Sequence, residues 1–355
     1  MSHFDYVILG GGCAGLSLAY ELDVNGRLAN KTLAIVEPRE SYSRDKTWSF
    51  WKVEPHHHGD CVVGEWSRFR VSSGTSERLI DCPETPYQTI DSGLFYDKIR
   101  RRLNQNPGVS FLRSADQLNL SASLVFNSVP PALDPESKTF QHFKGWEVQT
   151  ADDVFEPGMV DLMDFDCEQR GQVHFFYVLP FSKNRALIET TWLGPLAVGS
   201  DDYDRQLSRY LRSRFDVEHH DVVFEEQGAI PLFELDAPQR ANWVNIGGVG
   251  GMTRLSTGYA FLNIQRHSRF LSDNIHRLNA SNAFSICKRY QKLDRIFLRV
   301  LDRHPALMPS VFTDFFAGKP SNAISFLSGR GSFGGDLATI WQMPKLPFLR
   351  AAVGF

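Results

Sequence analysis

The sequence predicts an α/β protein in which a parallel, nucleotide-binding sheet is interrupted by a largely antiparallel sheet and followed by a helical part. Three observations lead to this fold class: a glycine-rich turn between a short apolar run and a helical pattern, long strand-like runs mid-chain, and helical periodicity at the end. We expect the parallel domain over 1–130 and 240–280, the inserted sheet over 131–239 and the helical region over 281–355.

The N-terminal turn has the spacing of a dinucleotide-binding fingerprint. Tyr6 to Leu9 is an apolar run typical of a strand, and Gly10, Gly12 and Gly15 follow at G-x-G-x-x-G spacing before the pattern becomes helical. Gly10 permits the tight turn, Gly12 lets a phosphate approach the backbone, and the helix N-terminus offers free N–H groups. The expected cofactor-binding residues of this turn are Gly10, Gly11, Gly12, Ala14 and Gly15.

An acidic residue follows at the expected distance. The predicted strand Lys31–Val36 ends in Glu37, which lies 22 residues beyond Gly15. An acid at this position accepts hydrogen bonds from a ribose. Strand, glycines, helix, strand and acid in this order favour a bound dinucleotide over a plain turn.

The composition excludes several function classes. A formal charge of −3 without a long basic block excludes an electrostatic nucleic-acid binder. The five cysteines are scattered, without a C-x-x-C pair, and no signal segment precedes them, so we expect a cytoplasmic protein. No run approaches the ~18 apolar residues of a transmembrane helix, but a peripheral membrane contact stays open.

The segment after Glu37 is polar but contains Trp48 and Trp51. The pair is either a plug over the core or a lid over a flavin or an apolar substrate, and we take Thr47 and Trp48 as candidate cofactor contacts. Three consecutive histidines, at positions 56–58, cannot all face one metal from a strand or helix, so we expect a solvated loop and no metal site.

The rest of the parallel domain is expected to leave the sheet and return to it. Alternation from Trp66 to Gln88 suggests hairpins, an excursion near 60–90. Asp91 and Ser92 then cap a helix that runs to about Leu103. Short strands at 110–112 and 124–126 re-enter the sheet.

The inserted sheet and the C-terminal part are predicted from the later periodicity. Strands are expected at 145–148, 175–179, 186–192, 222–224 and 230–233, with an amphipathic helix over 201–215. A second strand-then-glycine turn at 244–251 feeds a helix; its Gly248, Gly251 and Met252 are further candidate cofactor contacts, and a plain turn is the alternative. The apolar stripes from 282 onward are read as core or as the wall of a hydrophobic tunnel.

Seven segments in this order resemble the bacterial lycopene cyclase family. They are the N-terminal fingerprint, Thr47-Trp48-Ser49-Phe50, Gly145-Trp146-Glu147, Leu162-Met163-Asp164-Phe165, Tyr177-Val178-Leu179-Pro180, Leu187-Ile188-Glu189-Thr190-Thr191, and Gly250-Gly251-Met252 through Ser256-Thr257-Gly258-Tyr259. The chain departs from the family pattern at Thr190, where relatives carry an acid, at Arg254-Leu255, where many carry Lys-Pro, and at Asn127, where Asp is typical.

The resemblance implies a glutathione-reductase-like Rossmann flavoprotein that binds FAD without net redox turnover. The implied activity converts the linear end of lycopene, or of a related linear carotenoid, to a β-ring. The flavin is expected in its reduced form with NADPH as the reductant. Because such a substrate dissolves in lipid, the resemblance also implies a cytoplasmic protein attached peripherally to the membrane.

Ring closure needs an acid that protonates an alkene, a dry pocket and a base. A carboxyl group in apolar surroundings has the raised pKa that the acid requires. The family motif makes Glu189 the first candidate, although it could instead act with the reduced flavin, which would stabilise the cation or relay the proton. Asp164 is a second catalytic candidate and Glu147 a third, and for both a purely structural role is the stronger reading.

Other flavin-dependent classes remain as alternatives. A monooxygenase or halogenase shares the opening fingerprint but commonly has Gly-Asp where this chain has Gly247-Gly248, and the Trp-x-Trp-x-Ile-Pro segment of halogenases is absent. An isoprenoid or carotenoid reductase is closer in chemistry. A flavin-binding carotenoid carrier is the non-enzymatic reading.

Overall fold

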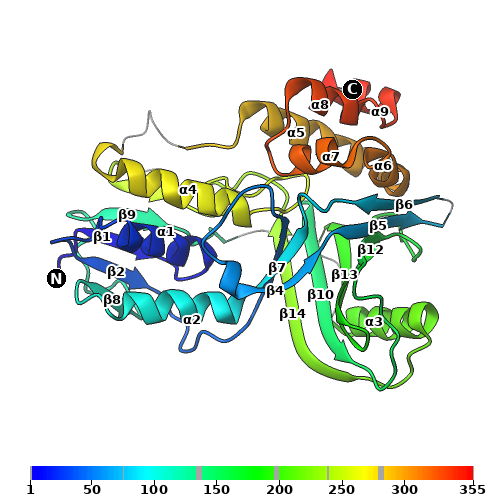
Figure 1. Ribbon diagram of the computed structural model, residues 1–355. Coiled ribbons are helices and arrows are strands. Elements are labelled where there is room, and N and C mark those ends of the chain that lie inside the picture. Colours follow the sequence, from blue (N-terminus) through cyan, green and yellow to red (C-terminus); the bar gives the residue numbers. More distant parts are fainter. Residues whose placement is uncertain are drawn as a thin grey trace.

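The N-terminal part of the protein is a parallel sheet covered by helices (Figure 1). The computed structural model describes residues 2–74, 76–132, 138–195, 200–237, 240–278 and 284–354. Five strands pair in parallel in the order β15-β9-β1-β2-β8. Their bounds are Tyr6–Leu9 (β1), Leu33–Val36 (β2), Val109–Leu112 (β8), Leu124–Asn127 (β9) and Trp243–Asn245 (β15).

Three helices pack against one face of this sheet. They are α1 (Cys13–Val24), α2 (Ser92–Leu103) and α4 (Phe261–Asn274). Tyr6 and Ile8 of β1 share a buried apolar cluster with these helices, whereas Val7 lies in a separate cluster on the other face. The expected cap of α2 is present, because the Asp91 side chain accepts a hydrogen bond from Leu94 N. The Rossmann-type prediction is confirmed.

The second sheet has seven strands in the order β14-β10-β13-β12-β11-β5-β6, and only the β11–β5 pair is parallel. Its long central strands stand upright in Figure 1. The strand bounds are Arg68–Ser73 (β5), Ser76–Asp81 (β6), Phe140–Gln149 (β10), Val160–Asp164 (β11), Val173–Ser182 (β12), Arg185–Gly194 (β13) and Asp221–Pro231 (β14).

Two expectations for this region are corrected. The segments 222–224 and 230–233 are not separate strands: β14 is continuous through the polar residues between them, because each of these pairs with β10. The excursion near 60–90 does not stay with the nucleotide domain either. Its β5–β6 hairpin extends the seven-stranded sheet, while β3 (Thr47–Trp51), β4 (Val62–Trp66) and β7 (Tyr87–Asp91) form a small sheet of their own.

Different layers cover the two faces of the seven-stranded sheet. Helix α3 (Ser200–Phe215) packs on one face, against residues such as Phe176 and Ile188. The C-terminal helices cover the other face, against residues such as Phe175 and Leu187. These helices are α5 (Lys288–Arg303), α6 (Met308–Phe315), α7 (Pro320–Leu327), α8 (Phe333–Ile340) and α9 (Lys345–Ala352).

Side chains of the C-terminal stripe mostly fill the core. Phe312, Phe315 and Phe316 are buried against the sheet, whereas Cys287 is exposed. The stripe is therefore core rather than a tunnel wall in this structure. The expectation of a solvated histidine loop is wrong for His58, which is buried, shares a hydrogen bond with Gln265, and has its pKa lowered to about 4 by burial.

Candidate functional site

The first glycine turn has the backbone that a dinucleotide cradle requires. Gly10 has φ of +94°, and a Cβ on Gly15 would lie 2.0 Å from Gly10 O, so both positions need glycine. Gly12 precedes α1 without any side-chain cap, and a Cβ there would meet only Arg39 Nη2, at 4.0 Å. The helix N-terminus therefore faces open space with uncapped N–H groups, which suits a pyrophosphate.

Glu37 closes this turn from the end of β2. Its carboxylate accepts hydrogen bonds from Gly11 N (2.9 Å) and Arg39 N (3.1 Å). These hydrogen bonds and the Arg39 guanidinium outweigh partial burial and lower the pKa of Glu37, so the group is an anion that can accept from ribose hydroxyls. Tyr42 contributes a buried hydroxyl without a hydrogen-bond partner among the described residues.

The second glycine turn lies directly against the first. A Cβ on Gly247 would come within 2.8 Å of Ala14 Cβ, so this contact between the two turns depends on glycine. Gly248 and Gly251 are exposed on the surface of the turn. Met252 differs from the expectation: its side chain is fully buried in the core, and its N–H donates to Gly247 O at 3.0 Å. The structure leaves Met252 no donor toward a cofactor.

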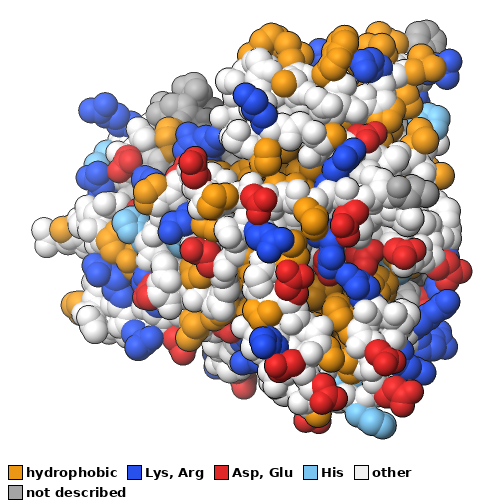
Figure 2. All heavy atoms as spheres, turned by 45° about the vertical axis from the view of Figure 1, so that its right-hand side comes forward, with side chains coloured by type: hydrophobic (Ala, Val, Ile, Leu, Met, Phe, Trp, Pro, Cys, Tyr) orange, Lys and Arg blue, Asp and Glu red, His pale blue; other side chains and the backbone are white. Residues whose placement is uncertain are grey.

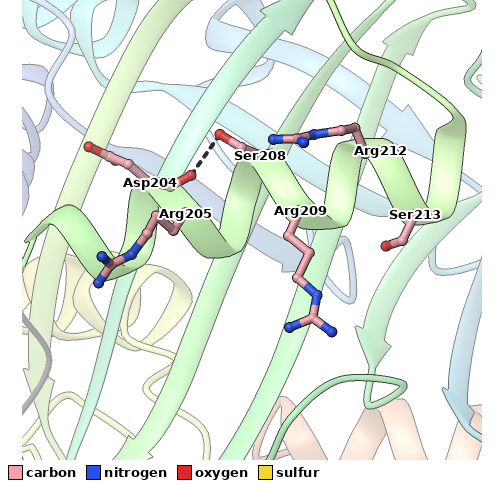
Figure 3. A pocket seen from close by; sticks show the side chains of 6 residues that line it. All are labelled: Asp204, Arg205, Ser208, Arg209, Arg212 and Ser213. Carbon is pink, nitrogen blue, oxygen red and sulfur yellow. Dashed lines mark hydrogen bonds between the residues drawn. The ribbon is translucent and has the colours of Figure 1, made fainter.

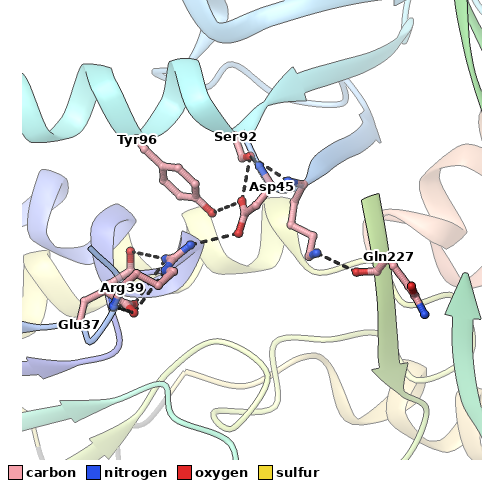
Figure 4. Close-up of polar contacts among 8 residues, drawn as sticks. Glu37, Arg39, Asp45, Ser92, Tyr96 and Gln227 are labelled. Carbon is pink, nitrogen blue, oxygen red and sulfur yellow. Dashed lines mark hydrogen bonds and ion pairs between the residues drawn. The ribbon is translucent and has the colours of Figure 1, made fainter. Parts of the chain in front are cut away.

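Polar side chains connect the nucleotide domain to the seven-stranded sheet (Figure 4). Asp45 accepts hydrogen bonds from Arg39, Ser92 and Tyr96, each at 3.0 Å. The next residue, Lys46, donates to Gln227 O on β14 at 2.9 Å. The segment after Glu37 therefore runs from the nucleotide turn to the strand that carries Glu226.

Glu189 and Glu226 lie on either side of one glycine. Gly145 of β10 pairs with Glu189 of β13 on one side and with Glu226 of β14 on the other, so all three share a face of the sheet. A Cβ on Gly145 would lie 3.3 Å from Glu226 Cγ and 3.7 Å from Glu189 Cβ. The missing side chain lets two carboxyl groups approach each other over the β10 backbone.

Both carboxyl groups hold a proton at higher pH than usual. Desolvation, followed by the nearby Glu226 charge, raises the pKa of Glu189 to about 8. Burial also raises the pKa of Glu226 to about 7, although Thr47 N donates to its carboxylate at 2.7 Å. The Glu189 carboxyl has the Thr191 hydroxyl as its hydrogen-bond partner, at 2.5 Å. At neutral pH Glu189 is thus a neutral acid beside a group that is partly ionised.

Aromatic rings line the same face of the sheet. Tyr177 pairs with Glu189 across β12 and β13, and its hydroxyl donates to Tyr87 at 3.0 Å. Trp51 lies against Tyr87 and Tyr259, with ring centroids 4.9 and 5.6 Å apart. We call Trp51, Tyr87, Tyr177 and Tyr259 the aromatic wall. Such rings present the negative faces that attract a cation.

The two aromatic residues of the loop motif have separate places. Trp51 is buried in the aromatic wall, so the plug reading holds for it. Trp48 is half-buried between α2 and α4, stacked on Phe261 at 5.7 Å and edge-on to Phe95. Thr47, the first residue of β3, instead contacts the seven-stranded sheet, because its backbone N–H donates to the Glu226 carboxylate.

Asp164 does not join Glu189. It pairs with Phe176 on the face covered by α3, and it accepts hydrogen bonds from Tyr210 (2.7 Å) and Ser72 (3.2 Å). Glu147 is buried between Arg44 and Arg185, both of which pair with it. Asp164 lies on the face opposite Glu189, and Glu147 is paired with two guanidinium groups, so neither is placed to act as the acid.

Two hollows show how the faces differ. One of about 670 Å³ is lined by polar and charged side chains of α3 (Figure 3), so it lies on the side away from Glu189 and does not suit a hydrocarbon. A second, of only about 30 Å³, lies beside the aromatic wall between β3, α4 and α7. It holds about one water, so a larger ligand would require its lining to move.

Sequence reasoning missed Glu226. It lies in a Glu-Glu-Gln-Gly run, which reads as a break between two strands. The available signal was the alternation of Val222, Phe224 and Glu226, which continues the strand period through the break. Only the pairing with β10 shows that the second carboxylate of this run turns inward.

Comparison with known proteins identifies the family. Residues 5–353 match the family model described as lycopene cyclase protein, so the chain belongs to the lycopene cyclase family. No curated protein sequence matches it.

Solved structures share the fold at low identity. A geranylgeranyl bacteriochlorophyll reductase-like protein from Thermoplasma acidophilum has 11% identity and a TM-score of 0.63, with 99% of this chain and 98% of that chain covered. A flavin-dependent brominase has 12% identity and a TM-score of 0.65, covering 96% and 97%. A flavoprotein/dehydrogenase from Cytophaga hutchinsonii has 11% identity and a TM-score of 0.65, covering 99% and 98%. At these identities the likeness establishes the fold.

Proposed function

We propose that this member of the lycopene cyclase family converts the linear end of lycopene, or of a related linear carotenoid, to a β-ring. The reaction is an acid-initiated isomerisation without net redox change, with FAD bound in its reduced form and NADPH as the reductant. The single observation that carries the proposal is the neutral carboxyl of Glu189, held beside Glu226 and an aromatic wall on the family's own motif.

The two glycine turns support FAD as the bound group. Gly10, Gly12 and Gly15 would cradle the pyrophosphate at the N-terminus of α1, and Glu37 would accept from the adenosine ribose. Gly248 and Gly251 would approach the flavin end from the second turn. When bound and reduced, the flavin supplies negative charge that stabilises a cation nearby.

Glu189 is the proposed proton donor. Its O–H bond breaks as a C–H bond forms at the terminal alkene, which leaves a carbocation on the substrate. A second alkene of the same chain closes the ring onto that cation. The rings of Tyr87 and Tyr177 lower the energy of the cation, and the buried face of the sheet excludes the water that would quench it.

Glu226 is the proposed base. Ring closure ends when a different C–H proton is lost, and a carboxylate close to the donor can take it. Glu226, with a pKa of about 7, is the more readily ionised member of the pair. Transfer of that proton back to Glu189 across Gly145 would restore the starting state, so the product has the mass of the substrate.

Pigment analysis of a Glu189→Gln variant tests the proposal. Cells that make lycopene and express this chain should accumulate a cyclic isomer of equal mass, and the variant should form it at least about 100-fold more slowly. Thr191→Val, which removes only the hydrogen-bond partner, is the matched variant and should retain most activity. Full ring formation by Glu189→Gln would rule out the acid role.

The same extract separates the alternatives. A carotenoid or isoprenoid reductase would give a product two hydrogens heavier. A monooxygenase would give one oxygen atom more. A carrier would leave lycopene unchanged, and Glu189→Gln would then have no effect on the pigment.

A Gly12→Ala variant tests the cofactor separately. The new methyl group has no protein atom closer than 4.0 Å, so the fold should be unchanged, but it would occupy the space proposed for the pyrophosphate. We expect purified Gly12→Ala to lose flavin absorbance. Gly158→Ala, which also meets nothing, is the control and should keep it. Equal flavin content in both would place the cofactor elsewhere.

A further inference from the structure

Large apolar side chains are exposed together on the last two helices. The described residues include 13 large hydrophobic side chains that are exposed, and six of these lie between positions 333 and 353. Monomeric soluble proteins rarely expose such a contiguous patch without a partner for it. We call these six residues the C-terminal patch: Phe333, Leu337, Trp341, Leu346, Leu349 and Val353.

The patch follows helical spacing on both helices. Phe333, Leu337 and Trp341 recur every four residues along α8 and its C-cap, and Leu346 and Leu349 share a face of α9. The faces turned inward carry smaller or polar groups, such as Asp336 and Ala351, both buried. Ile340 and Phe348 pack partly against the core, but each helix also turns several large apolar side chains outward, unlike an ordinary surface helix.

The charge of the C-terminal segment that carries the patch is mainly positive. From position 315 onward the sequence has four cations and one acid, a formal charge of +3, which leaves −6 for residues 1–314. The one acid, Asp336, is buried and paired with Arg289 at 2.8 Å. Lys345 and Arg350 are exposed between the apolar side chains, without an ion pair among the described residues. The accessible charge of this region is therefore cationic.

A space-filling view shows the same arrangement. Hydrophobic side chains gather at the top of the molecule over the C-terminal helices, with Lys and Arg among them, while the acidic side chains visible in this view lie lower (Figure 2). The Lys345 ammonium lies 4.6 Å from the Trp341 ring centroid. Tryptophan beside lysine is the pairing typical of the boundary between lipid headgroups and acyl chains.

We propose that the C-terminal patch docks on an anionic phospholipid surface. Leu349, Trp341 and Phe333 enter the headgroup boundary, and Lys345 and Arg350 bind lipid phosphates beside them. Each helix has eight residues, about 12 Å, so both lie in the plane of the surface. Among the described residues no helix is long and apolar enough to cross a bilayer.

This inference deepens the proposed function, because it names the surface through which a lipid-dissolved substrate would be reached. The inner side of the same helical layer covers the sheet face that carries Glu189. Docking through the patch would therefore bring the membrane to the layer above the candidate site. Its test does not depend on cyclisation, since vesicle binding requires no carotenoid.

Vesicle sedimentation tests the docking surface. The full chain should sediment with vesicles of phosphatidylcholine and phosphatidylglycerol, and less with phosphatidylcholine alone. The triple variant Phe333→Ser, Trp341→Ser, Leu349→Ser should lower the partition coefficient by at least about 10-fold, because it removes the inserted apolar area. The double variant Lys345→Glu, Arg350→Glu should abolish the preference for the anionic vesicles.

Matched variants keep the result decisive. Leu79→Ser and Val223→Ser remove exposed apolar side chains elsewhere and should bind as the wild type does. All replaced residues are exposed, so a common thermal midpoint should confirm that each variant folds. Unchanged sedimentation of the triple variant would overturn the proposal. A second outcome would also overturn it: the wild type does not bind vesicles and is a dimer in analytical ultracentrifugation, while the triple variant is a monomer. A second copy of the chain would then cover the patch.

A further control separates membrane docking from the proposed activity. Glu189→Gln should sediment with vesicles as the wild type does, whatever the effect on ring formation. If the triple variant loses vesicle binding but cyclises lycopene supplied in detergent, the patch serves docking alone. Loss of cyclisation by Glu189→Gln with normal vesicle binding concerns only the site.

Discussion

The two faces of the seven-stranded sheet hold carboxyl groups with different partners. On the face under the C-terminal helices, Glu189 and Glu226 are neighbours, neither forms an ion pair within the described part of the chain, and burial raises the pKa of both. On the face under α3, Asp164 instead accepts hydrogen bonds from the hydroxyls of Tyr210 and Ser72. Desolvation raises the pKa of a carboxyl group, and a second carboxyl group beside it raises the pKa further, so the Glu189–Glu226 pair suits proton transfer.

Adjacent residues on β13 show the same difference. Glu189 faces the helical layer, whereas Thr190 points to the α3 face, where it is hydrogen-bonded to His174 (2.8 Å) and Gln206 (2.6 Å). The departure from the family pattern at position 190 therefore lies in a satisfied polar network. It does not touch the carboxyl pair.

After Glu189→Gln, the largest effect should come from breaking the pair at Glu226. Glu226→Gln should slow ring formation by about 10- to 100-fold, because the proposed base is lost. The same change removes the negative neighbour that raises the pKa of Glu189, so the alkaline limb of the pH–rate profile should move to lower pH. Rates measured from pH 6 to 9 on purified protein check both. An unmoved limb would show that the two groups are not coupled.

A smaller loss is expected when Gly145 receives a methyl group. In Gly145→Ala the new Cβ would lie 3.2 Å from Leu187 Cδ1 and 3.3 Å from Glu226 Cγ, so the pair must separate by a few tenths of an ångström. We expect about a 10-fold loss of activity with flavin retained. Gly59→Ala is the control, because a Cβ at Gly59 would have no described atom within 4 Å. Gly171→Ala would not serve, because the φ of +73° at Gly171 is strained for any other residue.

On the α3 face, a matched substitution should change stability and leave activity intact. Asp164→Asn weakens the hydrogen bonds from Tyr210 and Ser72, which should lower the free energy of unfolding by about 1–2 kcal/mol. Urea unfolding gives the stability, and the rate per folded molecule should stay within about twofold of wild type. A large fall in that rate would return Asp164 to the candidate acids.

The smallest expected effect is a pH dependence of stability from Glu189. Its folded-state pKa of about 8 lies above the ordinary value of 4.5, so the folded state binds the proton more tightly and wild-type stability falls as pH rises from 4.5 to 8. Glu189→Gln lacks this loss. Because Glu189 is only half-buried, we expect the variant to gain about 1 kcal/mol relative to wild type between pH 5 and 8. Equal slopes of stability against pH would show an ordinary carboxylate.

Local patterns determined much of the nucleotide domain. The order of β1, the glycines, α1, β2 and Glu37 could be read directly, because each step depends on neighbouring residues: strand period, turn glycines and helix period. The N-cap at Asp91 and the amphipathic helix α3 could be predicted for the same reason. The family motif likewise directed attention to Glu189.

Partners from distant parts of the chain decided the rest. Glu226 lies 37 residues from Glu189, and only the shared neighbour Gly145 brings the two together. Asp164 and Glu147 could not be told from Glu189 by sequence, because face and salt-bridge partner are set by strand register and by residues such as Tyr210 and Arg44. The sequence alone thus determined the nucleotide turn and the acid motif. Tertiary structure decided that Glu189 is the carboxyl group with a raised pKa beside a second acid, because desolvation and charge pairing arise only when separate strands and helices meet.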